Sequence, residues 1–169
     1  MAALMTSVLD SSVKISAYIA ECRELGIALL PPDVNRSFDR FTVEEGGIRF
    51  GLVAVKNIGR GFIQTMMRRR EQDGPFRSFQ DFCQRMYDCG DMNKRAVENL
   101  IRSGAFDSMG ARRSQLLAVY EKVLDGIGNV RRRNVEGQID FFGMSAANST
   151  VETVVMPDIP EFTATERMH

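Results

Sequence analysis

Apolar residues recur at helical spacing through most of the chain. Residues 12–25 place apolar side chains near one face, begin at Ser12, which can cap a helix, and are followed by Gly26, so they predict a helix. Between Phe38 and Phe50 the pattern alternates imperfectly around a Gly-Gly pair at 46–47, which predicts a β-hairpin with a two-glycine turn. Three further helices are predicted over residues 79–86, 93–103 and 114–124.

Residues 52–70 are the most informative segment. Two apolar helical stretches are interrupted there by a polar, glycine-containing turn at 57–61. This order is typical of a helix-hairpin-helix motif. After Gly126, glycines and small polar residues predict a flexible connector. The predicted fold class is therefore mainly α with a small β-hairpin: a helix-hairpin-helix-containing helical domain followed by a flexible C-terminal connector.

The residue types of the 57–61 turn suit an anion. A phosphate oxygen can approach the unpaired N–H groups at the N-terminus of the second helix, where the helix dipole favours negative charge. Glycines leave room for that approach, Ile58 would pack between the helices, and Asn57 tolerates a left-handed backbone. A bulky residue at Gly59 is expected to disturb binding and local folding together. The predicted DNA-binding residues are Lys56, Asn57, Ile58, Gly59, Arg60, Gly61, Arg68 and Arg69.

Binding through this turn is expected to be sequence-neutral and strongly salt-dependent, because no base-reading group is evident. The competing interpretation is an ordinary glycine turn between core helices, with solvated arginines. A second hairpin candidate spans 97–106, but only Gly104 matches the turn glycines, and Phe106 stands in place of the other. Its residues favour a plain helical hairpin.

Composition narrows the class of protein. The 22 basic and 22 acidic residues cancel, yet residues 49–70 hold six basic residues and no acidic one, which indicates a focused anion site. Three irregularly spaced cysteines favour a reducing compartment over a disulfide framework. The only histidine is His169, so a Cys/His zinc site lacks ligands. No apolar run approaches membrane-spanning length, so no membrane partner is expected.

A short motif lies in the predicted connector. Ile139, Phe141 and Phe142 would be costly to expose to water unless a partner buries them. One hypothesis is a linear docking motif in which the phenylalanines fill an apolar pocket and Gln138 bonds at its rim. The alternative is that these residues fold back onto the parent core. The predicted docking residues are Gln138, Ile139, Asp140, Phe141 and Phe142.

Several blocks together closely resemble the bacterial DNA polymerase III alpha subunit, a replicative C-family polymerase. These blocks are Tyr18 to Ile27, Leu30 to Asn35, Gly51 to Gly59 and Leu100 to Asp107, in the same order. The resemblance implies three regions: residues 1–36 as the end of the fingers, 37–126 as a β-hairpin plus helix-hairpin-helix DNA-binding region, and 127–169 as a connector with a clamp-binding motif at 138–142. Residues 157–162 resemble the lead-in to an oligonucleotide-binding-fold domain, so the chain is interpreted as an excised piece.

The resemblance also implies partners and the absence of catalysis. The expected partners are double-stranded DNA, the ring-shaped sliding clamp, and the other domains and subunits of a replicative polymerase in the bacterial cytoplasm. The family's catalytic carboxylates lie upstream of Met1, so no catalytic residue, metal or cofactor is expected here, while the parent polymerase is expected to use Mg²⁺. Two alternatives remain: an enzyme using Asp33, Asp39 and Glu44, and a structural spacer between polymerase domains.

Overall fold

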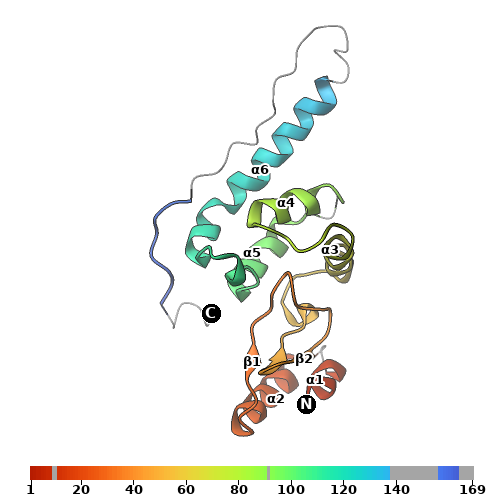
Figure 1. The fold of residues 1–169 in the computed structure, drawn as a ribbon, viewed down its shortest axis with the longest axis vertical. Helices are drawn as coiled ribbons and strands as arrows, with labels where there is room; N and C mark the ends of the chain where they lie inside the picture. Colours follow the sequence, from red (N-terminus) through yellow and green to blue (C-terminus); the bar gives the residue numbers. More distant parts are fainter. Residues whose placement is uncertain (9–10, 91, 138–155, 164–169) are drawn as a thin grey trace.

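The computed structural model describes residues 1–8, 11–90, 92–137 and 156–163. Its described part is mainly helical with one small sheet, which confirms the predicted fold class (Figure 1). The helices are α1 (Ala2–Ser7), α2 (Ser12–Glu24), α3 (Arg60–Asp73), α4 (Phe79–Tyr87), α5 (Lys94–Ser103) and α6 (Arg113–Gly137), with 3-10 turns η1 (Leu52–Ala54) and η2 (Asp107–Met109). The strands are β1 (Leu29–Leu30), β2 (Thr42–Glu44) and β3 (Gly47–Arg49).

The predicted β-hairpin is confirmed, but its turn lies one residue earlier. Residues 45–46 form the turn, Gly46 has a φ of 92°, and Gly47 already belongs to β3. Strand β1, which the sequence did not reveal, pairs parallel with β3, so the strand order is β1-β3-β2. Strand β1 has only two residues and ends directly before the Pro31-Pro32 pair. Such a short strand leaves no periodic signal in the sequence.

A small N-terminal core joins α1 and α2 to this sheet. Met5 and Cys22 from the helices are fully buried with Phe41 and Ile48 from the sheet region. This packing therefore crosses the predicted boundary at 36/37. Helix α2 is capped by Ser11, whose hydroxyl accepts the N–H of Lys14 at 3.5 Å, rather than by the Ser12 that the pattern suggested.

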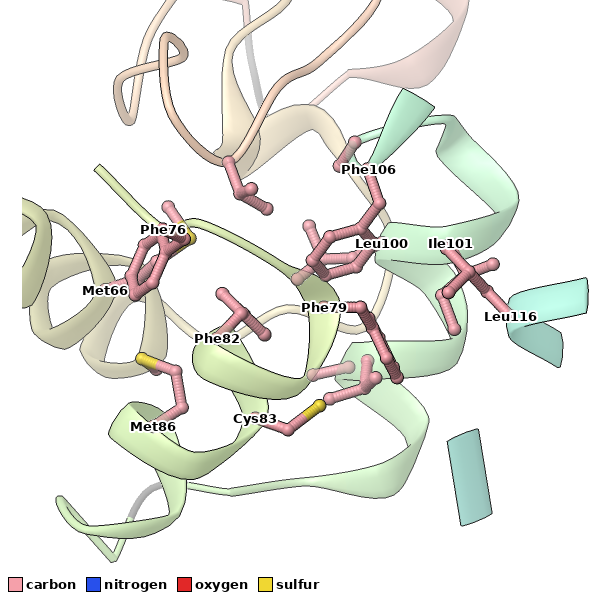
Figure 2. Packing of buried hydrophobic residues seen from close by; sticks show 14 of the residues in the cluster. Met66, Phe76, Phe79, Phe82, Cys83, Met86, Leu100, Ile101, Phe106 and Leu116 are labelled. Atoms are coloured by element: carbon pink, nitrogen blue, oxygen red, sulfur yellow. The ribbon is translucent and has the colours of Figure 1, made fainter. Parts of the chain in front are cut away.

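The main core lies among α3, α4, α5 and α6 (Figure 2). Phe82 and Phe106 are buried near its centre, with ring centroids 5.0 Å apart in an edge-to-face arrangement. Phe79 makes a similar contact with Phe106 at 5.0 Å. Helix α4 buries positions 79, 82, 83 and 86, one face of a 3.6-residue helix. Aromatic contacts of this kind add about 0.5–1.5 kcal/mol each beyond burial.

The loop of residues 33–38 connects the two cores. The side-chain amide of Asn35 pairs with the backbone of Phe76, accepting its N–H at 2.8 Å and donating to its carbonyl at 2.9 Å. Val34 donates its N–H to the carbonyl of Ala105 at 3.0 Å. Arg70 donates to the carbonyls of Val34 and Ser37. This loop, which leads into the β-hairpin, is therefore held against α3 and against the residues that follow α3 and α5.

The first predicted helix of residues 52–70 is only a 3-10 turn. Leu52 donates its N–H to Phe38 at 2.9 Å and Val53 donates to Asp39 at 3.0 Å. These bonds hold the start of the segment against the preceding loop, and Val55 is extended, with φ −81° and ψ 125°. Tertiary contacts have thus replaced the α-helix that the apolar pattern predicted.

The last predicted helix is longer than expected. Helix α6 continues through Gly126 and Gly128 to Gly137, so the predicted start of the connector at 127 lies within a helix. Each interior glycine costs about 1 kcal/mol relative to alanine. Val123, Leu124 and Ile127 are buried in the main core, and that packing stabilises the helix across the glycines. Within the described segments, no helix is both long and apolar enough to cross a lipid bilayer.

Candidate nucleic-acid interface

The 57–61 turn has the backbone that the sequence predicted at Asn57. Asn57 has a φ of 59° and, among the described residues, is the one non-glycine with a positive φ. Asparagine adopts this left-handed conformation more readily than most residues because its side chain can bond locally. Ile58 is half-buried and packs against the main core, although the first of the two helices between which it was expected to pack is only the 3-10 turn η1.

Helix α3 begins without a side-chain cap. Gly59 is its N-cap residue, with φ −70° and ψ 147°, and no side chain accepts a bond from the first-turn amides. A Cβ added at Gly59 or Gly61 would meet no heavy atom within 4 Å. A methyl group at either position therefore meets no steric obstacle, whereas the effect of a bulky residue at Gly59 on local folding stays a prediction. Both glycines instead leave the amides of α3 open to an external acceptor.

Three cations lie near the start of α3 or on the helix itself. In sequence, Lys56 precedes the helix, Arg60 is its first residue, and Arg68 follows about two turns later. Lys56, Arg60 and Arg68 are exposed, and no acidic side chain among the described residues forms an ion pair with them. Arg68 makes one long contact with the hydroxyl of Thr65, at 3.4 Å. Uncompensated cations beside a positive helix end produce a local field that attracts anions.

The other basic residues of the stretch serve the fold. Arg49 is buried and donates to Glu44 at 2.7 Å and to the carbonyl of Pro31 at 2.9 Å. Arg70 bonds two carbonyls beneath the 33–38 loop and lies over the Phe38 ring at 5.2 Å, and burial lowers its pKa. The sequence could not show which of the six basic residues are exposed to an external anion and which serve the fold, because composition does not reveal which cations have internal partners.

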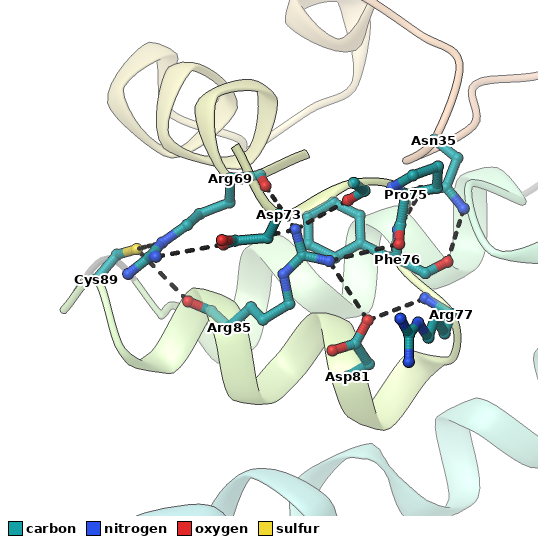
Figure 3. Close-up of polar contacts among 10 residues, drawn as sticks. Asn35, Arg69, Asp73, Pro75, Phe76, Arg77, Asp81, Arg85 and Cys89 are labelled. Carbon is teal, nitrogen blue, oxygen red and sulfur yellow. Dashed lines mark hydrogen bonds and ion pairs between the residues drawn. The ribbon is translucent and has the colours of Figure 1, made fainter. Parts of the chain in front are cut away.

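Arg69 is intermediate in character between the exposed cations and the arginines that have internal partners (Figure 3). Its Nε donates to the sulfur of Cys89 at 2.9 Å and one terminal nitrogen contacts Asp73 at 3.4 Å. Arg69 and Cys89 line a recess of about 350 Å³ together with Thr65, Arg68 and Gln72. Gln72 follows Arg68 by one helical turn, a spacing that could have suggested it; nothing in the sequence pointed to Cys89.

The second hairpin candidate is internally closed. Gly104 ends α5 with a left-handed φ of 84°, and Phe106, at the position of the missing glycine, is a core residue. The guanidinium of Arg113 covers the turn by bonding Asp107 at 2.6 Å and the carbonyl of Arg102 at 3.1 Å. The N-terminus of α6 is capped from residues 156–163, which run beside it (Figure 1). This end of the molecule therefore differs from the open start of α3.

The carboxylates considered for an enzyme have structural partners. Glu44 bonds Arg49 and Arg36, and the Arg49 hydrogen bond, which outweighs the opposing effect of burial, lowers the Glu44 pKa. Asp33 is buried and accepts the N–H of Asn35 at 2.7 Å. In the described ranges, no group of three or more His, Cys, Asp or Glu side chains could hold a metal ion. The predicted docking residues 138–142 lie outside the described residues.

Comparison with known proteins agrees with this geometry. The model of a family described as the helix-hairpin-helix motif matches residues 26–116. The chain is 42% identical over 143 residues to DNA polymerase III subunit alpha of Saccharopolyspora erythraea, covering 85% of this chain and 12% of that protein. The corresponding proteins of Thermus aquaticus and Vibrio cholerae are 40% and 34% identical, covering 94% and 95% of this chain and 13% and 14% of theirs.

The chain thus spans about an eighth of the length of these relatives. The family match includes the 57–61 turn, the open start of α3 and the second hairpin. On these grounds, the chain belongs to the helix-hairpin-helix motif family and is similar to one segment of bacterial DNA polymerase III alpha subunits.

Proposed function

We propose that the chain binds the backbone of double-stranded DNA through the 57–61 turn and the N-terminus of α3. The observation that carries the proposal is the uncapped start of α3, with unhindered glycines at its N-cap and second helical positions. Phosphate oxygens suit this site because orphan amides and the helix dipole both favour an anion there. Lys56 and Arg60 supply charge that no internal acid in the described part of the chain neutralises.

The binding should be independent of base sequence. Its donors are backbone amides and long cations, which contact phosphates and carry no information about base edges. Each neutralised phosphate contributes a slope of about −0.9 to the dependence of log K on log salt. Affinity should therefore fall steeply as salt rises.

A duplex titration at several salt concentrations tests the proposal. In the double variant Lys56→Ala/Arg60→Ala, affinity should fall and the salt slope should shrink by roughly one to two. The matched control is Arg95→Ala/Lys122→Ala, which removes two exposed cations on α5 and α6 and should leave the slope nearly unchanged. Equal slopes in wild type and in the 56/60 variant would favour the alternative, a structural spacer between polymerase domains.

We further propose that this segment serves within a replicative DNA polymerase, whose other parts supply catalysis and Mg²⁺. The similarity to DNA polymerase III alpha subunits supports this proposal. The segment itself would hold duplex DNA without performing nucleotidyl transfer.

Docking of the sliding clamp through Gln138, Ile139, Asp140, Phe141 and Phe142 is part of the same proposal. Its support is the residue pattern and its place in the family's order of motifs. Aromatic side chains of this kind act as anchors when a partner pocket buries them.

A further inference from the structure

The recess on the second half of α3 is separate from the open start of that helix. Its α3 residues lie about 8 to 18 Å along the helix axis from Arg60, at about 1.5 Å of rise per residue. Small-molecule sites have volumes of roughly 300–1,000 Å³. The recess, at about 350 Å³, is therefore large enough for a small ligand of its own.

The α3 side of the recess carries hydrogen-bond donors without strong internal partners. Arg68 is exposed and makes only the 3.4 Å contact with the Thr65 hydroxyl. Gln72 is exposed one helical turn later, and its amide makes no hydrogen bond within the described part of the chain. Arg69 uses its Nε for Cys89 and one terminal nitrogen for Asp73, whereas its other terminal nitrogen is not bonded to any described residue (Figure 3).

The nearest acid does not cancel this positive charge. Asp73 lies 3.4 Å from a terminal nitrogen of Arg69 and 3.8 Å from one of Arg85, so two guanidinium groups share its single charge. Arg68 forms no ion pair with any residue that the structure describes. An anion entering the recess would therefore meet a net positive charge.

The number of donors indicates the class of anion. A carboxylate has two oxygens, and a phosphodiester of the nucleic-acid backbone has two that are not esterified. A phosphate monoester has three acceptor oxygens and a charge of about −1.5 to −2 at neutral pH. Arginine forks bind such groups through paired hydrogen bonds, and an amide N–H can reach the remaining oxygen.

We propose that the recess is a binding site for a phosphate monoester, either a mononucleotide or the 5′-phosphate end of a DNA strand. The guanidinium of Arg68 and the remaining terminal nitrogen of Arg69 bind two phosphate oxygens, and the amide of Gln72 binds the third. This site goes beyond the proposed grip on the duplex backbone, because none of its ligand groups belongs to the 57–61 turn.

Cys89 reports directly on occupancy of the recess, because it is partly exposed and lines it. The rate of iodoacetamide labelling at Cys89 is measured on the complete chain with inorganic phosphate, with adenosine monophosphate, and with chloride at the same ionic strength. Both phosphates should slow labelling several-fold relative to chloride. Equal rates in all three solutions would overturn the proposal.

Two variants and one matched control locate the effect. Arg68→Ala removes the fork, and Gln72→Glu keeps the length of the side chain but replaces its donor with an anion. Each should abolish the slowing by phosphate, measured as the ratio of rates with and without phosphate in the same variant. Arg77→Ala removes an exposed arginine outside the recess and should retain the wild-type ratio. Slowing that survives in both recess variants would place the phosphate elsewhere and overturn the proposal.

The same assay distinguishes the two sources of the monoester and separates this proposal from the first-hairpin one. In the Lys56→Ala/Arg60→Ala variant, adenosine monophosphate should still slow labelling, and loss of that effect would contradict a separate site. In this variant, a duplex with 5′-phosphate ends is compared with the same duplex carrying 5′-hydroxyl ends. Greater slowing by the phosphorylated ends assigns the site to DNA ends as well, and equal rates restrict it to free mononucleotides. Failure of the 56/60 change to alter duplex affinity would count against the first hairpin only.

Discussion

Arg69 donates a hydrogen bond from its Nε to the sulfur of Cys89 at 2.9 Å, and this contact ties the second half of α3 to the turn that follows α4. The neighbouring Arg68 is exposed and has only a long contact, to Thr65. Adjacent residues on a helix point about 100° apart, so two arginines that look equivalent in sequence take different environments. Arg69 is mainly a packing residue, whereas Arg68 is available to an external anion.

Replacing each arginine by alanine should therefore give opposite results. Arg68→Ala should weaken duplex binding and reduce the salt slope by up to about 0.9, with an unchanged melting temperature. Arg69→Ala should lower the melting temperature and affect DNA binding less than Arg68→Ala. Thermal unfolding and DNA titration on the same samples measure both. Identical profiles for the two variants would contradict this division.

The left-handed residue of the first hairpin could be predicted from sequence, because the requirement is local. The turn uses one residue with positive φ, and Asn57 is the non-glycine residue there that best tolerates it. The roles of Arg49 and Arg70 could not be predicted in the same way. Their partners, Glu44, Val34 and Ser37, meet them only after the sheet and the 33–38 loop have folded.

Helix lengths also depend on tertiary contacts that the local sequence pattern does not show. Residues 52–57 carry an apolar pattern that suits a helix, but the amides of Leu52 and Val53 bond the preceding loop instead. Helix α6 carries two glycines that suggest an end, yet buried side chains on either side of Gly126 hold it together. Local propensities of about 1 kcal/mol per residue are smaller than the tertiary contacts that oppose them.

Changes at Asn57 and Gly59 separate turn geometry from anion access. Asn57→Val places a β-branched residue at φ 59° and should destabilise the chain by about 1–2 kcal/mol. Gly59→Ala introduces a methyl group into open space with an ordinary φ of −70°, so stability should be nearly unchanged while DNA affinity falls. Urea unfolding and duplex titration measure the two effects. A loss of stability in Gly59→Ala comparable to that of Asn57→Val would show that Gly59 is structural.

The ion pair of Glu44 and Arg49 should make stability depend on acidic pH. The hydrogen bond from Arg49 lowers the Glu44 pKa below its ordinary value of 4.5. The unfolded chain then binds more protons than the folded chain near and below that pH, so stability rises with pH there. The contribution is complete above about 4.5 and is lost as pH falls through the folded pKa.

Glu44→Gln should consequently be less stable than wild type at pH 7, by about 1–3 kcal/mol. That difference should shrink as pH is lowered below 4.5, because the wild-type carboxylate is then protonated as well. Urea unfolding of both proteins across this range measures it. A difference that stays constant with pH would contradict the role given to the ionised carboxylate, because Gln keeps the shape of the side chain and lacks its charge.

The cysteines offer a footprint of the recess on α3. Cys22 and Cys83 are fully buried, burial raises the pKa of the Cys83 thiol, and Cys89 is partly exposed. Iodoacetamide should therefore label Cys89 in the folded chain and leave the other two unmodified, as peptide mass spectrometry would show. Duplex DNA should slow this labelling, and the Lys56→Ala/Arg60→Ala variant should lose the protection. Equal labelling rates with and without bound DNA would place the DNA away from the recess.

Clamp docking is expected to depend on Gln138, Phe141 and Phe142. The two phenylalanines carry apolar surface whose burial is worth about 25 cal/mol per Å², and Gln138 can bond the rim of a pocket. A single short segment that must be ordered on binding should reach only about micromolar affinity. A ring with several identical sites, or tethering by DNA held at the first hairpin, would raise the effective affinity.

Changing these three residues to alanine should abolish clamp binding. Two lost aromatic anchors of about 2 kcal/mol each weaken a micromolar contact by roughly a thousandfold, which is beyond detection in an ordinary titration. The circular dichroism spectrum and the DNA affinity should be unchanged.

The control is a triple alanine variant at Ser145, Asn148 and Ser149, which alters the same stretch of sequence without removing an anchor and should bind the clamp normally. Clamp binding that survives in the first variant would place the docking site elsewhere, whereas unfolding of that variant would show that the phenylalanines belong to a core. Loss of binding in both variants would implicate the stretch as a whole and contradict the anchor model.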